Sequence, residues 1–192
     1  MSKFRRIGIL GGSFNPIHLG HLAIAEQARE SLRLDKVVFI PANIPPHKQI
    51  KGFASAQERY YLTQLACQGN PDFQVCDLEI IRGGVSYSVE TLKELKSIYP
   101  KARLYFIAGA DFLTEFSAWK AIGKLKSLCT FVVAPRPGHP LKRLPKGMQA
   151  IDVAALEISS TVIRNRLKKG KSIRYLVPEK VQQYILRKRL YR

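Results

Sequence analysis

The chain has 192 residues, which is enough for one hydrophobic core and short for two. Hydrophobic residues make up 46% of it, yet no apolar stretch approaches the ~18–20 residues that cross a membrane, and the N-terminal residues show no signal-peptide cleavage site. The formal net charge of +18 excludes an acidic protein and predicts attraction to anions such as nucleic acids or polyphosphates.

Strand-like apolar runs alternate with helical patterns along almost the whole chain. Strands are predicted at residues 6–10, 36–40, 73–78, 103–108 and 129–134, with a weaker one at 149–153. Helices are predicted at residues 19–32, 55–68, 88–99, 118–125, 160–168 and 178–188. This alternation predicts the α/β class, with a parallel sheet covered by helices on both faces. Functional loops of such sheets follow the carboxyl ends of the strands, here residues 11–20, 41–53, 81–87, 109–119 and 134–147.

Residues 11–21 read GGSFNPIHLGH and join the first predicted strand to the first helix. Glycines let the backbone come close to a phosphate, and a helix N-terminus presents N–H groups with partial positive charge. His18 and His21 are three residues apart, so they share one helix face and predict an anion site. The GxGxxG and GxxxxGK[ST] patterns are absent. The alternatives are zinc ligation, against which no HExxH motif or nearby cysteine pair is present, and a turn that the histidines merely cap.

The segment ISSTVIR, residues 158–164, is a second candidate anion site. Its hydroxyl groups stand at a predicted helix start, where they can cap backbone N–H groups. Arg164, one turn further on, faces the same direction and can offer a planar pair of N–H groups to a phosphate. The alternative is an ordinary capped helix whose arginine is solvated.

The placement of basic residues and of cysteines predicts the partners and the compartment. From Arg164 onward there are eleven Lys or Arg residues against a single acid, Glu179. No aromatic cluster or recognition-helix pattern accompanies them, so we interpret the charge as a solvated surface that also attracts phosphate. Cys67, Cys76 and Cys129 show no CxxC spacing, which predicts free thiols and a cytoplasmic protein.

The HxGH pattern of residues 18–21 resembles the signature of the nucleotidyltransferase superfamily. With its other motifs, the chain resembles the bacterial nicotinate-nucleotide adenylyltransferases over nearly its whole length. The motifs are GGSFNPIHLGH at 11–21, PANIPPHK at 41–48, SYS at 86–88 with TL at 91–92, IAGAD at 107–111, the single tryptophan, ISSTVIR at 158–164, LVP at 176–178 and LYR at 190–192. That family commonly has Thr and Asp where this chain has Ser13 and Asn15. Serine keeps the hydroxyl group, whereas asparagine keeps the shape and loses the negative charge.

This resemblance implies a Rossmann-like three-layer fold and a single nucleotidyltransferase domain over residues 1–192. It also implies the reaction of ATP with nicotinate mononucleotide, with Mg²⁺ bridging phosphates, to give deamido-NAD and pyrophosphate. The acceptor phosphate already carries charge, so no general base is needed; two anions must be brought together and the developing charge stabilised.

The resemblance assigns residues to three roles. The implied catalytic residues are His18, His21 and Arg164. The implied ATP-binding residues are Gly11, Gly12, Ser13, Phe14, His18, Gly20, His21, Gly109, Asp111, Ser159, Ser160, Thr161 and Arg164. The implied acceptor-binding residues are Asn43, His47, Lys48, Ser86, Tyr87, Ser88 and Trp119. No residue is implied to ligate a metal ion directly.

Several of these residues also have a plain structural interpretation. Trp119, the only tryptophan, could stack on the pyridine ring or belong to the core. Asp111 could bind a ribose hydroxyl or cap a helix. His47 could contact a phosphate or be solvated in its loop. No role is assigned to His139.

Two other functions compete with this interpretation. A related HxGH adenylyltransferase would use nicotinamide mononucleotide or phosphopantetheine as the acceptor; Trp119 and the SYS motif argue against the latter. A basic nucleic-acid-binding protein, from a different class, would need neither anion motif, so no specific nucleic-acid partner is expected. The sequence leaves the oligomeric state open, a homo-oligomer included.

Overall fold

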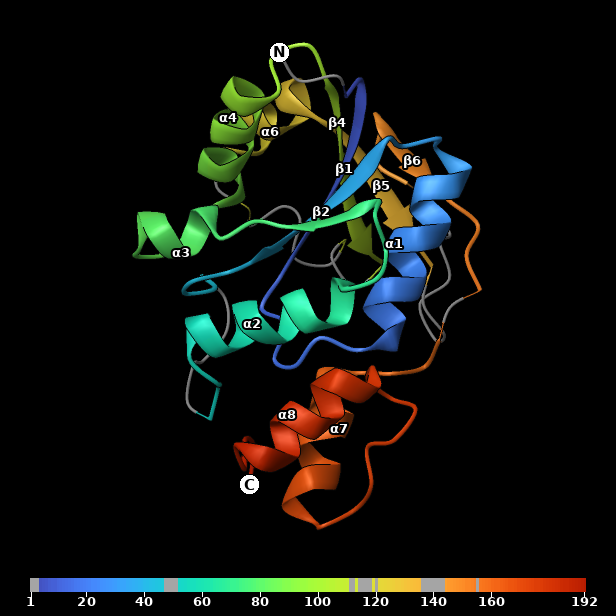
Figure 1. The fold of residues 1–192 in the computed structure, drawn as a ribbon. Helices are drawn as coiled ribbons and strands as arrows, with labels where there is room; N and C mark the ends of the chain where they lie inside the picture. Colours follow the sequence, from blue (N-terminus) through green and yellow to red (C-terminus); the bar gives the residue numbers. More distant parts are fainter. Residues whose placement is uncertain are drawn as a thin grey trace.

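Six parallel strands form one sheet in the computed structural model of the chain, which describes residues 4–46, 52–110, 113, 119, 121–135, 144–154 and 156–192 (Figure 1). The strands are β1 (Arg6–Gly12), β2 (Lys36–Pro41), β3 (Phe73–Val75), β4 (Arg103–Gly109), β5 (Thr130–Ala134) and β6 (Met148–Ala150). Their order across the sheet is β3-β2-β1-β4-β5-β6, so the direction of winding reverses between β1 and β4. Open α/β sheets bind ligands at the carboxyl ends of the strands beside such a reversal.

Helices cover both faces of this sheet. They are α1 (Leu19–Ser31), α2 (Ala56–Cys67), α3 (Leu78–Arg82), α4 (Ser88–Ile98), α6 (Ile122–Leu128), α7 (Ser160–Lys168) and α8 (Glu179–Arg187). Buried side chains of α1, α2, α7 and α8 join one core cluster, whereas those of α4 and α6 join the other. Figure 1 shows α8 beside α2, with α7 at the same end of the molecule, where the chain passes from β1 to α1. In the described part of the chain, no helix is both long and apolar enough to span a membrane.

The apolar strands are buried on both sides because alternate side chains point to opposite faces. In β2, Val37 and Phe39 belong to the cluster under α1 and α2, and Val38 and Ile40 belong to the cluster under α4 and α6. All four are at most 1% exposed. The predicted α/β fold, a Rossmann-like parallel sheet with helices on both faces, is confirmed.

The largest differences between predicted and observed elements lie in three places. The third strand ends at Val75 rather than at residue 78, because Leu78 begins the short helix α3, which was not predicted. The weak strand predicted at 149–153 is observed at Met148–Ala150. The helix predicted at 118–125 begins at Ile122, after a left-handed Ala121 with φ of 57°.

We predict that Gly8→Ala lowers the free energy of unfolding by about 1–3 kcal/mol, the usual cost of overpacking a core. Gly8 lies inside β1, and a Cβ atom there would lie 2.7 Å from Cδ1 of Leu34 and 3.0 Å from Cδ1 of Ile107. Both neighbours are buried, so they cannot move aside freely. Urea unfolding measures the change.

Gly123→Ala is the matched control. Gly123 lies in α6, and a Cβ atom there would meet nothing within 4 Å. Alanine restricts the unfolded chain more than glycine does, so the free energy of unfolding of this variant should rise by about 0.5–1 kcal/mol. Equal effects of the two substitutions would contradict the packing argument.

Candidate active site

The turn between β1 and α1 stands where the strand order reverses. Gly11 and Gly12 are the last residues of β1, and Gly12 pairs with Pro41 at the end of β2. Ser13 and Phe14 follow in the turn, and Phe14 is only 2% exposed. A buried aromatic ring therefore anchors the turn to the core.

His18 and His21 lie together at the start of α1, as their spacing predicts. Their rings stack with centroids 3.6 Å apart, and the ring of Phe14 meets that of His21 edge-on at 5.1 Å. The backbone N–H of His18 donates to Nδ1 of His21 at 3.2 Å. Because Nδ1 accepts this bond, the proton of a neutral His21 ring is on Nε2, which is then a hydrogen-bond donor.

The start of α1 is less open than the sequence predicts. The N–H of Leu19 donates to the carbonyl of Leu176, and the N–H of His21 donates to the carbonyl of His18, both at 3.0 Å. Of the first three N–H groups of the helix, only that of Gly20 has no acceptor among the described residues. The prediction of a free helix N-terminus is met only in part, since the segment before α8 covers the first residue.

Gly20 makes room for the ring of His18. A Cβ atom at position 20 would lie 3.0 Å from Nδ1 and 3.2 Å from Cε1 of that ring. Contacts this short would force the ring to move. The glycine of the HxGH pattern therefore sets the position of the first histidine.

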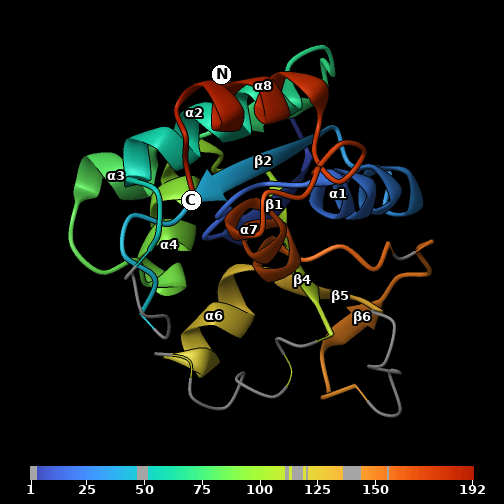
Figure 2. The ribbon, with the colours of Figure 1, turned by 90° about the horizontal axis from the view of Figure 1, so that it is seen from below.

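The second predicted motif docks onto the first. The hydroxyl of Ser160 donates to the carbonyl of Pro16 at 2.8 Å, and Nη1 of Arg164 donates to the carbonyl of Asn15 at 2.8 Å. Figure 2 shows α7 over the end of the sheet, near β1 and β4. The two candidate anion sites are thus one site, assembled from segments far apart in the sequence.

The remaining hydroxyl groups of this motif support the helix. Ser159 is the N-cap of α7, and its Oγ accepts the N–H of Val162 at 3.2 Å. Oγ1 of Thr161 accepts a bond from Nη2 of Arg164 at 3.2 Å. Arg164 therefore uses two of its five N–H donors in these two bonds, which leaves three for a ligand.

The predicted acceptor-binding loops are tied to each other. The backbone N–H of Asn43 donates to Oγ of Ser86 at 2.9 Å, and Nδ2 of Asn43 donates to the carbonyl of Gly84 at 2.9 Å. The N–H of Ser86 returns a bond to the carbonyl of Ile44. Tyr87 is the N-cap of α4 and Ser88 its first residue. Three hydrogen bonds therefore join the loop after β2 to the loop before α4.

Trp119 packs near the carboxyl ends of β1 and β4. Its ring meets that of Phe106 edge-on, with centroids 5.6 Å apart, and Phe106 is the nearest side chain to the position of a Cβ on Gly11, at 3.6 Å. Trp119 is partly buried rather than enclosed in the core. Gly109, another predicted ATP-binding residue, ends β4 and pairs with Ala134.

Four residues discussed from the sequence lie outside the described part of the chain. They are His47, Lys48, Asp111 and His139. The roles that the resemblance implies for His47, Lys48 and Asp111 stay predictions.

Arg59 is a site residue that the sequence analysis missed. It is 2% exposed, and its guanidinium donates to the carbonyls of Ser13, Asn43 and Ala54. Burial lowers the pKa of this guanidinium, but the ordinary value is so high that the group stays charged at neutral pH. Arg59, Leu62, Thr63 and Ala66 are all buried and follow the i, i+3, i+4, i+7 pattern, which could have revealed a buried arginine.

Asn15 is buried and has a structural role. Its Oδ1 accepts the backbone N–H of Ala54 at 3.0 Å, and it is 1% exposed. Its Nδ2 has no partner within the described residues. A neutral amide therefore fills this position and supplies the one acceptor that the neighbouring backbone needs.

Metal ligands do not gather in the described part of the chain. No group of three or more His, Cys, Asp or Glu side chains there could hold a metal ion. The zinc alternative for His18 and His21 therefore finds no third ligand among these residues.

Comparison with known proteins identifies the family. The family model for cytidylyltransferase-like proteins matches residues 9–166. A relative from Desulfitobacterium hafniense, named "Probable nicotinate-nucleotide adenylyltransferase", is 48% identical over 199 residues, with 98% of this chain and 96% of the relative covered. One of the same name from Thermus thermophilus is 47% identical over 187 residues, with 97% and 100% covered. The chain belongs to the family of nicotinate-nucleotide adenylyltransferases. It is thereby an enzyme of the nucleotidyltransferase class.

A solved structure agrees with this fold. Plasmodium falciparum nicotinic acid mononucleotide adenylyltransferase, complexed with NaAD, superposes with a TM-score of 0.82 and covers 97% of both chains at 22% identity. The arrangement of strands and helices is therefore shared even where few residues are.

The buried carboxyl group of Glu79, which lies beside Ser86, should make the stability of the protein depend on pH. Glu79 is 7% exposed, accepts a bond from the hydroxyl of Thr91 at 2.6 Å, and interacts with the side chain of Ser86. Burial raises the pKa of this carboxyl above its ordinary value of 4.5. The folded protein therefore binds this proton more tightly than the unfolded chain does. The resulting stabilisation is complete below the ordinary pKa of 4.5, and it is lost as the pH rises through the raised pKa of the folded state.

Glu79→Gln removes this titration and keeps an acceptor for Thr91. We expect the wild-type protein to lose stability relative to the variant as pH rises from 4.5 towards neutrality. Urea unfolding of both proteins across this range measures the difference, in which the titration of other groups cancels. A difference that stays constant with pH would contradict the prediction.

Proposed function

We propose that this enzyme transfers the adenylyl group of ATP to nicotinate mononucleotide, giving deamido-NAD and pyrophosphate. The observation that carries the proposal is the assembly of His18, His21 and Arg164 around one turn at the carboxyl end of β1. Full-length similarity to nicotinate-nucleotide adenylyltransferases supports the choice of substrates.

The reaction needs positioning and charge stabilisation rather than a base. An oxygen of the acceptor's phosphate attacks the α-phosphorus of ATP, and the bond from that phosphorus to the pyrophosphate oxygen breaks. The attacking oxygen is already anionic, so no proton has to be removed. Donors aimed at the α-phosphate and the leaving pyrophosphate stabilise the charge that spreads over them.

The donors at the turn suit these needs. We assign His18 and the Nε2 donor of His21 to the α-phosphate region, beside the N–H of Gly20. Arg164, with three N–H groups left, is assigned to the outer phosphates. The hydroxyl hydrogen of Ser160 is engaged by Pro16, so we assign this side chain to holding α7 in place rather than to donating to phosphate.

The nucleotide is proposed to enter as its Mg²⁺ complex. Mg²⁺ is commonly held by phosphates, waters and few protein oxygens. Held in this way, the ion would supply positive charge to the phosphates. Activity should therefore depend on added Mg²⁺ at concentrations that saturate ATP.

The acceptor is proposed to bind against the joined loops after β2 and before α4. Trp119 is partly buried, so one face of its ring is proposed to stack on the pyridine ring. Backbone N–H groups near Tyr87 and Ser88 are proposed to bind the nicotinate carboxylate, and Asn43 to contact the nucleotide. His47, Lys48 and Asp111 are proposed to complete the phosphate and ribose contacts.

We also propose that the enzyme is a single domain and is located in the cytoplasm. Buried residues of α7 and α8 share a core cluster with those of α1 and α2, which supports one nucleotidyltransferase domain over residues 1–192. Cys67, Cys76 and Cys129 are free thiols, which fits a reducing cytoplasm.

Pyrophosphate release from ATP tests the function directly. The purified protein is assayed with Mg²⁺ and, in turn, nicotinate mononucleotide, nicotinamide mononucleotide and phosphopantetheine. An amide in place of the carboxylate leaves one donor unpaired, so kcat/KM should favour the acid by about tenfold to several hundredfold. Equal values for acid and amide would refute the specificity. The proposed function would be refuted if pyrophosphate were released with phosphopantetheine but with neither mononucleotide, or if it were released equally well without any acceptor.

His18→Ala should lower turnover by about 10²–10³-fold, the usual loss when a transition-state donor is removed, with little change in stability. Gly20→Ala should lower turnover too, because the added Cβ displaces the His18 ring.

The double variant separates this effect from others. If Gly20 acts through His18, Gly20→Ala should cost little further activity in the His18→Ala background. Fully multiplicative losses would show that the two residues act independently.

A further inference from the structure

Arg59 joins three segments around the site. Its Nη1 donates to the carbonyl of Ser13 at 2.7 Å, its Nη2 to that of Asn43 at 2.9 Å, and its Nε to that of Ala54 at 3.1 Å. Ser13 follows β1 and Asn43 follows β2, so one side chain spans the ends of two neighbouring strands. We propose that Arg59 is a positioning residue that holds the ATP-binding turn and the acceptor-binding loop at the separation the transfer needs. This inference rests on the proposed function.

The positive charge of Arg59 is buried, so it carries a desolvation cost. Buried cations usually have a carboxylate partner, but the ion pairs within the described residues involve Arg29 and Arg82. Glu79 attracts Arg59 electrostatically without forming such a pair. An apolar side chain of similar length would fill the space without this desolvation cost. The charged group therefore points to a requirement of the adjoining loops rather than to the packing of α2.

The three hydrogen bonds to these carbonyls require a guanidinium group. Its N–H groups lie in one plane and point in fixed, divergent directions, so they can reach three carbonyls at once. The ammonium of lysine places its three donors on a single atom at the end of a flexible chain. Arg59→Lys thus keeps the charge and loses the span.

Both loops carry proposed substrate contacts beside the carbonyl that Arg59 holds. Ser13 directly precedes Phe14, whose ring packs on His21, and Asn43 binds Ser86 through its backbone N–H. A displacement of about 1 Å between reacting groups can cost on the order of 100-fold in rate. Loss of Arg59 should therefore affect both substrates and the chemical step together.

The first test compares Arg59→Lys with Leu62→Ala. Leu62 lies on the same buried face of α2 and is 0% exposed, so its truncation destabilises the core but removes no hydrogen bond to either loop. We expect Arg59→Lys to lower kcat about tenfold or more and to raise KM for both substrates. Leu62→Ala should lower the melting temperature and leave both KM values within about twofold. The same kinetic changes in both variants, or none in Arg59→Lys, would overturn the proposal.

Chemical rescue separates positioning from general stability. In Arg59→Ala, millimolar guanidinium ion should enter the vacated space, bond to the same carbonyls and restore part of kcat. Urea at the same concentration has a similar shape and no charge, and should restore less. Equal restoration by both, or by neither, would contradict a role specific to the guanidinium.

Amide hydrogen exchange gives a readout that needs no activity. In Arg59→Lys, peptides containing Asn43 and Ser86 should exchange faster than in the wild-type protein, while those of β4 change little. In Leu62→Ala, any increase should not favour these loops. If the wild-type protein transfers no adenylyl group, the proposed function fails, and exchange alone then decides whether Arg59 holds the loops. Unchanged exchange in Arg59→Lys would show that it does not.

Discussion

The turn between β1 and α1 contains carbonyl groups that lie outside any strand or helix, and the site depends on how they are satisfied. Side chains distant in the sequence do so: Arg59 donates to Ser13, Arg164 to Asn15 and Ser160 to Pro16. The first donor comes from α2 and the other two from α7. The bonds that satisfy this turn thus also bring both helices to the carboxyl end of the sheet, around the paired histidines.

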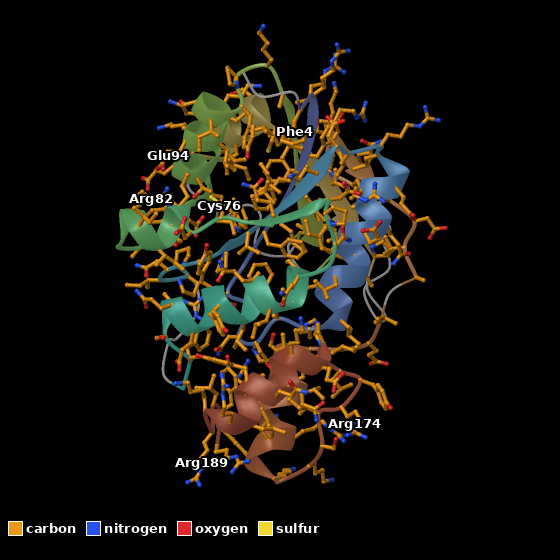
Figure 3. All side chains as sticks on the ribbon, in the orientation of Figure 1. Phe4, Cys76, Arg82, Glu94, Arg174 and Arg189 are labelled. Atoms are coloured by element: carbon orange, nitrogen blue, oxygen red, sulfur yellow. The ribbon has the colours of Figure 1, made fainter. Side chains whose placement is uncertain are left out.

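The same arrangement concentrates positive charge where polyanionic ligands would bind. Arg59 is buried and Arg164 partly buried at the turn, and Arg174 and Arg189 project from the α7–α8 region at the same end of the molecule (Figure 3). The ion pairs among the described residues engage only Arg29 and Arg82 as cations. The net charge of +18 acts over distance and attracts phosphates, and this attraction weakens as the salt concentration rises.

Sequence patterns predicted the sheet, the covering helices and the two anion motifs, because periodicity and turn chemistry act locally. They did not predict that Ser160 would bond to Pro16, or that Leu176 would occupy the N–H of Leu19. Such bonds depend on which distant segments the topology brings together. Arg59 was missed for a related reason: its partners are backbone carbonyls, which leave no trace in residue identity. The five-residue helix α3 is too short to show a helical period.

Because α7 docks on the turn after β1, this turn is completed only late in synthesis. The turn after β1 is made early, whereas Ser160, Arg164 and the Leu176 carbonyl follow some 145–160 residues later. Domains generally fold as units during synthesis. Because α7 and α8 share a core cluster with α1 and α2, the turn obtains its last partners only after these late helices have been made. A chain interrupted before α7 would contain His18, His21 and the residues of all six strands but would lack the donors Ser160 and Arg164, so the turn can be completed only in a nearly finished polypeptide.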